Sequence, residues 1–141
     1  MRKRTQAREV ALKALYLLDV RGDEIVPELD GYLREDTQDE DVLSYARVLI
    51  DGVREHLREI DEQIAAAAQN WELKRLAVVD RNILRIAVFE LLREADVPAR
   101  AVLNEAIEIG KKFSTAQSGA FINGVLDKVL SRLPGRSTPG A

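Results

Sequence analysis

Apolar residues recur at the spacing of a helical face along nearly the whole chain, and this periodicity constrains the fold more than any other feature. It holds even in the segment from Ser118 to Leu133, which contains Asn123-Gly124, a dipeptide typical of tight hairpins. A glycine inside a helix costs about 1 kcal/mol relative to alanine, so we expect either an adjacent helix or a ligand to approach Gly124 closely. The pattern predicts an all-α protein.

The periodicity predicts several helices within a single domain. They are expected at about 5–20, in a short segment opened by Pro27, in the longest stretch from Val42 to Ile64, and at about 79–94, 100–113 and 118–133. An acidic linker is expected at 35–41, and a short helix or connector at 71–76. Residues 1–133 suffice for one hydrophobic core. Residues 134–141 are rich in Pro and Gly and are expected to be a disordered tail.

Composition excludes several classes of function. The chain has no Cys, which removes disulfides, thiol nucleophiles and thiolate zinc sites. It has no apolar run long enough to cross a membrane and no apolar core of a secretory signal. We therefore expect a cytoplasmic protein that does not bind membranes.

Candidate catalytic groups are few. His56, the single histidine, lies in a charged run and is expected to face solvent. There is no Gly-rich phosphate loop and no metal-ligand spacing, and nothing singles out Glu105 or Glu108 for acid–base chemistry. We expect a binding module with no catalytic residue, no metal and no cofactor. An enzyme that uses either glutamate is an alternative, and it requires a pocket with strongly perturbed carboxylates.

Charge is distributed unevenly along the chain. Residues 1–16 carry five cations and one carboxylate, a net charge of +4. Because the whole chain has a net charge of −3, residues 17–141 have a net charge of −7. A basic arm on an acidic body is typical of a protein that attracts a polyanion through one surface, although a solvated helix end has the same composition.

Some apolar and acidic positions are not explained by one core face. Leu12 and Tyr16 lie on a charged side of the first helix, where they pack against another helix or contact a partner. Ile86 and Phe89 project opposite the main apolar stripe of their helix, which predicts burial between two layers. Asp80 begins that helix and is expected to be its N-cap.

Four ordered motifs, ALKALYLLD, VDRNILRIAVFEL, VPARAVLNEAIEIGKKF and SGAFINGVLDKVL, resemble the NusB transcription antitermination family. The resemblance runs from about Arg4 to Leu133 and implies two three-helix bundles packed roughly perpendicular. It also implies that the protein catalyses no reaction and binds the single-stranded boxA element of ribosomal RNA operon transcripts together with NusE, a small-subunit ribosomal protein. That complex joins RNA polymerase and suppresses premature termination.

The resemblance also implies which residues contact RNA. Thr5 and Gln6 replace arginines of some relatives, so the arm is light, and Gln117 replaces an acidic residue, which removes repulsion toward phosphate. The RNA-binding residues are expected to be Lys3, Arg4, Arg8, Phe113, Gln117, Ser118, Phe121 and Asn123.

The same resemblance implies a NusE-binding surface. Tyr16 and Asp80 match positions that contact NusE, and Asp80 is a methylene shorter than the glutamate of some relatives. Arg85 and Glu90 belong to the same motif and are weaker candidates.

Two alternatives keep this fold. The first is a structural homodimer that buries Leu12, Tyr16, Ile86 and Phe89. The second is a NusB-like RNA-binding module that serves ribosomal RNA modification, as in methyltransferases that carry such a domain. The short chain argues against the second.

Overall fold

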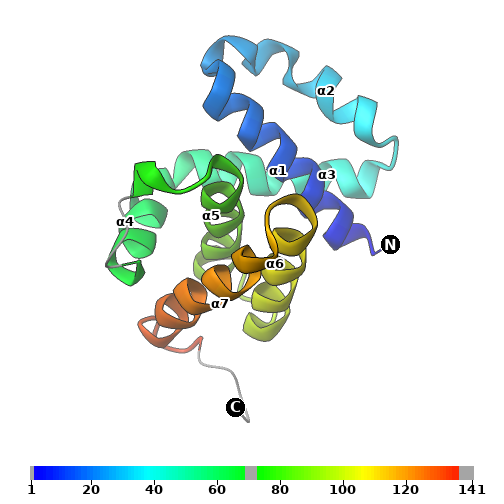
Figure 1. Ribbon diagram of the computed structural model, residues 1–141. Coiled ribbons are helices and arrows are strands. Elements are labelled where there is room, and N and C mark those ends of the chain that lie inside the picture. The colour runs from blue at the N-terminus through cyan, green and yellow to red at the C-terminus, as the bar shows by residue number, and fades with distance from the viewer. Residues whose placement is uncertain (1, 69–72, 137–141) are drawn as a thin grey trace.

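The computed structural model describes residues 2–68 and 73–136, and in this part of the chain every regular element is a helix (Figure 1). The all-α prediction is confirmed. The α-helices are α1 (Lys3–Arg21), α2 (Leu29–Asp36), α3 (Glu40–Glu55), α4 (Leu57–Ala67), α5 (Val78–Arg93), α6 (Ala99–Phe113) and α7 (Ala116–Ser131). Short 3-10 helices lie at Asp23–Glu28 and Leu73–Arg75.

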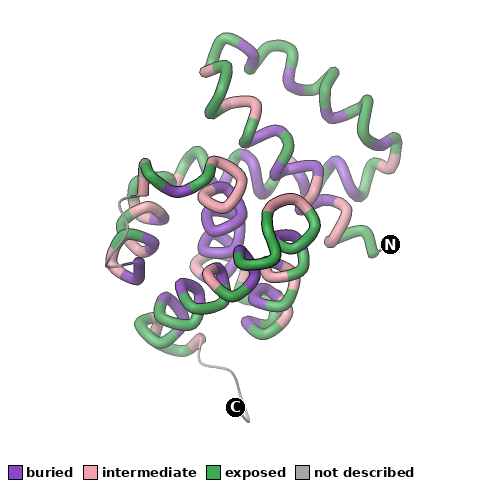
Figure 2. The backbone as a smooth tube through the Cα atoms, viewed as in Figure 1, coloured by how far each residue is buried: buried purple, intermediate pink, exposed green. Residues whose placement is uncertain are grey.

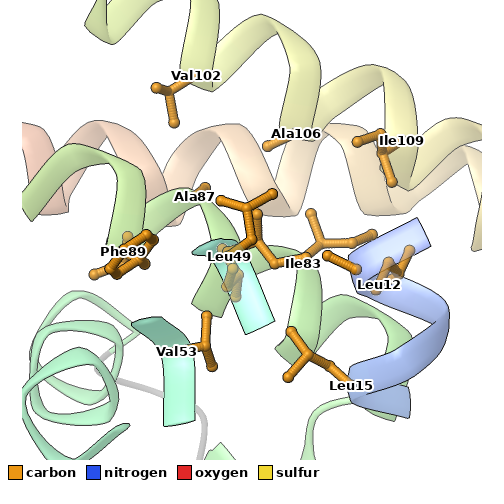
Figure 3. Packing of buried hydrophobic residues seen from close by; sticks show 14 of the residues in the cluster. Leu12, Leu15, Leu49, Val53, Ile83, Ala87, Phe89, Val102, Ala106 and Ile109 are labelled. Atoms are coloured by element: carbon orange, nitrogen blue, oxygen red, sulfur yellow. The ribbon is translucent and has the colours of Figure 1, made fainter. Parts of the chain in front are cut away.

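Helix α5 is the centre of the molecule. It contacts α1, α3, α4, α6 and α7, and all its residues from Asn82 to Leu91 are buried, as the nearly continuous purple of this helix in Figure 2 shows. Ile83 and Ala87 lie between side chains of α1 and α3 on one side and of α6 on the other (Figure 3). Ile86 and Phe89 are also buried. The predicted burial of this helix between two layers is therefore confirmed.

Outside α5, the most extensive packing joins two pairs of helices. Helix α1 packs mainly on α3, with α2 beside it, and α6 packs mainly on α7. Figure 1 shows α1, α2 and α3 together at one end of the molecule and α6 and α7 at the other, with α5 between them. Two bundles crossing at a right angle remain a prediction.

The predicted long third helix is wrong, because the chain breaks at His56 into α3 and α4. Phe89 of α5 explains the break. Its ring lies so close to α3 that a Cβ on Gly52 would be 2.2 Å from two ring atoms, and it stacks on the His56 ring with centroids 6.3 Å apart. His56 is therefore half-buried rather than solvent-facing. This contact joins residues far apart in the sequence, so periodicity does not show it.

Two other boundaries differ from the predictions. The expected acidic linker is mostly helical, since α2 ends at Asp36 and α3 begins at Glu40. Asp39 caps α3, where its Oδ1 accepts hydrogen bonds from the amides of Asp41 and Val42 at 2.9 and 3.4 Å. Asp80 is not the N-cap of α5, because the helix begins at Val78 and its N-cap residue is Ala77.

The chain beyond α7 is anchored at Arg136. Its guanidinium donates to the carbonyls of Leu91 and Val97 at 2.9 and 3.0 Å and, more weakly, to those of Glu90 and Ala95. These contacts tie the last turn of α5 and the loop after it to the chain beyond α7, and the bond to Leu91 satisfies a carbonyl at the helix end. The predicted disordered tail is therefore wrong for Arg136, and residues 137–141 lie outside the described residues, as do 71 and 72 of the predicted connector.

Candidate nucleic-acid interface

The start of α1 carries exposed cations. Lys3 lies on the surface, where its Nζ is 2.6 Å from Asp41 Oδ2. The guanidinium of Arg4 lies over the ring of Tyr45, 3.8 Å from its centroid, and 4.0 Å from Asp96. Stacking on an aromatic face orients an arginine without using all its N–H donors. Arg4 is therefore positioned and still able to bind an anion.

Arg8 lies elsewhere, and this corrects its predicted place on the exposed arm. Its side chain is only 5% exposed and forms a two-pronged pair with Glu90, both N···O distances being 2.8 Å. A further nitrogen donates to Glu105 at 3.0 Å. These carboxylates neutralise Arg8 inside the protein, so we assign it to the core that supports the arm rather than to a phosphate contact.

Tyr45 completes this buried network. Its hydroxyl donates to Glu90 Oε2 at 2.6 Å, while its ring carries Arg4 on the outside. Burial, followed by the hydrogen bond to the Glu90 carboxylate, raises the pKa of Tyr45 well above its ordinary value, because ionisation would place two negative charges together. The network thus joins α1, α3 and α5 beneath the exposed cations. Sequence reasoning missed Tyr45, which no spacing connects to Arg4.

The other predicted RNA-binding residues lie at the end of α6 and in the first half of α7, and we call this region the α6–α7 corner. Gln117 and Asn123 are exposed, and Phe113 and Phe121 are half-buried. The Lys112 ammonium lies 5.3 Å from the Phe113 ring centroid and 3.0 Å from Glu9 of α1. That ion pair links the corner to the same helix that carries the arm.

Ser118 is buried and makes its contacts within the protein. Its Oγ lies 3.1 Å from Asp80 Oδ2, 2.9 Å from Ser114 Oγ and 3.1 Å from Thr115 Oγ1, which caps α7. It therefore positions the start of α7 against α5. The structure brings Asp80, predicted to contact a protein, to a residue predicted to contact RNA.

A pocket of about 270 Å³ opens at this junction. Its wall includes Asp80, Thr115, Gln117, Ser118 and Phe121. Asp80 Oδ1 is buried and has no hydrogen-bond partner among the described residues. Buried polar atoms are normally paired, so this unpaired oxygen is an exception beside the pocket.

The predicted partner-binding residues are split between surface and core. Tyr16 is 43% exposed, whereas Leu12, its neighbour one turn earlier, is buried in the protein's own core. Arg85 pairs with Asp61 at 2.9 and 3.0 Å, and Glu90 is the buried partner of Arg8. Arg85 and Glu90 are therefore not presented to a partner, which corrects their predicted place on a binding surface.

Tyr16 and Asp80 lie on segments that are tied together. Asp19, one turn after Tyr16, accepts a hydrogen bond from Asn82 at 2.8 Å and lies 3.3 Å from nitrogens of both Arg81 and Arg85. The second half of α1 is thus held against the beginning of α5.

Other site types receive no support from the described residues. Within 2–68 and 73–136 no group of three or more His, Cys, Asp or Glu side chains could hold a metal ion, and no described helix is long and apolar enough to cross a membrane. Glu105 is occupied by Arg8 and by the Thr5 hydroxyl, and Glu108 lies 3.7 Å from Lys111.

Comparison with known proteins gives consistent matches over nearly the full chain. The sequence model of the NusB family matches residues 5–131. The chain is 52% identical over 133 residues to the transcription antitermination protein NusB of Anaeromyxobacter dehalogenans strain 2CP-1, covering 94% of this chain and 93% of that protein. It is 45% identical over 135 residues to the protein of that name from Geobacter sulfurreducens, covering 95% and 98%.

Solved structures agree. The T. maritima NusB structure matches with a TM-score of 0.81 at 40% identity and covers 92% of this chain and 91% of that one. A crystal structure of the antitermination factors NusB and NusE in complex with dsRNA matches with a TM-score of 0.85 at 30% identity, covering 94% and 99%.

Proposed function

Because this chain belongs to the NusB family, we propose that it is a transcription antitermination factor that acts by binding alone. It binds boxA-type single-stranded RNA of ribosomal RNA operon transcripts together with NusE, in the cytoplasm. The bound complex joins the antitermination machinery of RNA polymerase. The proposal assigns it no catalytic residue and no cofactor.

The observation that carries the RNA-binding role is the surface shared by the arm and the α6–α7 corner. The Glu9–Lys112 pair links α1, whose first turn carries the exposed cations Lys3 and Arg4, to the end of α6, where the ring of Phe113 lies. Single-stranded RNA is bound by cations on its phosphates and by aromatic or guanidinium planes against its bases. This surface supplies both.

Gly124 fits the same role. Nothing lies within 4 Å of the position that its Cβ would take, so neither an adjacent helix nor the preceding loop packs there. The expectation of helix packing is wrong, and we propose that open space at Gly124 lets RNA approach α7 beside Phe121.

The role of NusE follows from the small number of available cations. Each phosphate neutralised contributes about −0.7 to the slope of log affinity against log salt for a single strand, so two or three arm cations bind weakly at cellular salt. A second protein that binds at Tyr16 and Asp80 adds surface and fixes the RNA path.

The test is a titration of labelled boxA-type RNA with the protein, alone and with NusE, at two salt concentrations. We expect NusE to strengthen binding and Arg4→Ala to weaken it with a flatter salt slope. Arg58→Ala is the matched control, since this side chain is 95% exposed and belongs to α4, a helix that lies across the molecule from the N-terminus in Figure 1.

In the same titration, Gly124→Leu should weaken binding while the protein stays folded. Unchanged affinity for a folded Gly124→Leu variant would remove Gly124 from the RNA surface. RNA that is ignored even with NusE present would overturn the proposed function itself.

A further inference from the structure

A groove of about 900 Å³ lies between the first turns of α1 and one face of α6. Residues at helical spacing form the α6 wall, beginning with Arg100 and Ala101 and continuing through Asn104 to Glu108. The α1 wall includes Arg2 and Arg4. Exposed arginines therefore stand on both walls of one concave surface.

The carboxylates that line the groove have cationic neighbours. Glu105 is paired with Arg8, and Glu108 lies 3.7 Å from Lys111. Asp96 is 4.0 Å from Arg4, a long and exposed contact that contributes little.

Two of the cations that line the groove are uncommitted. Within the described part of the chain, neither the Arg2 nor the Arg100 side chain has an ion-pair or hydrogen-bond partner, and both are exposed. Arg4 adds a guanidinium held in place by the Tyr45 ring. The positive charge that remains available in the groove thus comes from both helices, and a concave surface concentrates its field.

We propose that an RNA strand held by the arm runs along this groove and that Arg100 neutralises one of its phosphates from the α6 wall. Arginine suits this role because its planar fork donates two parallel hydrogen bonds to phosphate oxygens. A phosphate contact carries no sequence information, so Arg100 fixes the path of the backbone rather than the choice of bases. The inference rests on the proposed function and extends it to Arg100, a residue that the family resemblance did not place on the RNA.

The experiment compares wild-type protein with Arg100→Ala, Arg100→Lys and the Arg58→Ala control, each with NusE, on boxA-type RNA over a range of salt. Arg100→Ala should weaken binding severalfold and make the salt slope shallower by about 0.7, as expected for one phosphate of a single strand. The loss should be similar on an RNA of altered sequence. Arg100→Lys should retain the salt slope and part of the affinity. Thermal unfolding checks that the exposed substitutions leave the fold unchanged.

The outcomes separate this inference from the function beneath it. If wild type binds RNA and Arg100→Ala behaves like Arg58→Ala, the groove does not carry the strand, while the antitermination role stands. If Arg100→Ala weakens NusE binding in the absence of RNA, the groove is a protein contact and the inference is overturned. If wild type binds no RNA even with NusE, the proposed function and the inference fall together.

Discussion

At the scale of single residues, the buried Arg8–Glu90 pair has the largest predicted consequence. Arg8→Ala leaves Glu90 charged and buried, and losing one partner of a buried ion pair costs about 3–5 kcal/mol of unfolding free energy. Urea denaturation checks this. Arg4→Ala is the control, because exposed Arg4 loses its stack on Tyr45, worth about 1 kcal/mol or less, and a long, exposed contact with Asp96 that contributes little. Equal unfolding midpoints for the two variants would contradict the structural role assigned to Arg8.

Alanine substitutions at two helical glycines are predicted to change the stability of the protein in opposite directions. Gly52→Ala places a Cβ against the Phe89 ring and should destabilise the protein by about 1–3 kcal/mol, as overpacking does. Gly124→Ala meets nothing and should stabilise it by about 0.5–1 kcal/mol through helix propensity. Chemical denaturation measures both, and Phe89→Leu should relieve the strain in the Gly52→Ala background. Similar effects from both glycines would refute the close packing at Gly52.

Single residues also show where sequence reasoning ends. Tyr16 and Leu12 share a charged helix face, yet only Tyr16 is exposed, because other helices cover Leu12. Arg8 has the composition of an arm residue but finds Glu90, 82 positions away, inside the core. A wheel plot shows the face that a residue occupies and not what packs on that face, so these roles needed the tertiary structure.

At the scale of helices, Tyr45 connects α3 to α5 and makes stability depend on pH. Its pKa is raised in the folded protein by burial and by Glu90, so the protonated phenol favours folding below about pH 10, the ordinary tyrosine pKa. Stability should therefore fall as pH rises above about 10. Urea midpoints at a series of alkaline pH values check this. Tyr45→Phe should lose this part of the pH dependence, and an identical alkaline profile in that variant would disprove the assignment.

The end of α5 depends on Arg136. Its guanidinium satisfies carbonyls of the last turn and the following loop, and Arg136→Ala should lower the unfolding free energy by about 1–3 kcal/mol, the usual cost of leaving such groups unpaired. Arg132→Ala is the control at the same end of α7, since the structure shows no side-chain hydrogen bond for Arg132 within the described residues. Thermal melts would refute the anchoring if both variants lost equal stability.

Helix positions were largely predictable because apolar periodicity is local, and the predicted ranges of the first helix and of the last three lie close to α1, α5, α6 and α7. The break between α3 and α4 was not predictable. Val53 and Ile60 both belong on a buried stripe, whether or not the helix continues. Phe89 of α5 packs against Gly52 and His56 at the break, and the local sequence pattern does not show that contact.

At the scale of the whole molecule, the remaining question is which surface meets a second protein. Tyr16→Asp should prevent a 1:1 complex with NusE, since a new carboxylate on an exposed ring position disfavours an apolar contact. The variant alone should sediment as wild type does. Sedimentation velocity with and without NusE provides the measurement. A homodimer that persists when NusE is added would favour the structural-dimer alternative instead.

The candidate surface was predictable in outline and not in depth. The charge asymmetry of the chain located a basic end, and four motifs identified the family. Arg8, Arg85 and Glu90 are buried, however, so they do not belong to the surface. Arg100 lines the groove and joins the proposed surface. Charge along a sequence shows how many cations are present. Only their pairing in three dimensions shows which ones remain available.

Glu90 contacts both ends of the chain: its side chain holds Arg8, and its carbonyl accepts a hydrogen bond from Arg136. During synthesis the first helix emerges long before this partner, so Arg8 stays unpaired until α5 has left the ribosome. The contact between Arg136 and the Glu90 carbonyl forms only after the last residues of the chain have been made. The proposed RNA-binding end, although made first, is therefore set in place only after α5 and α6 have been made, and a truncated nascent chain would expose a basic helix that is not yet held in position.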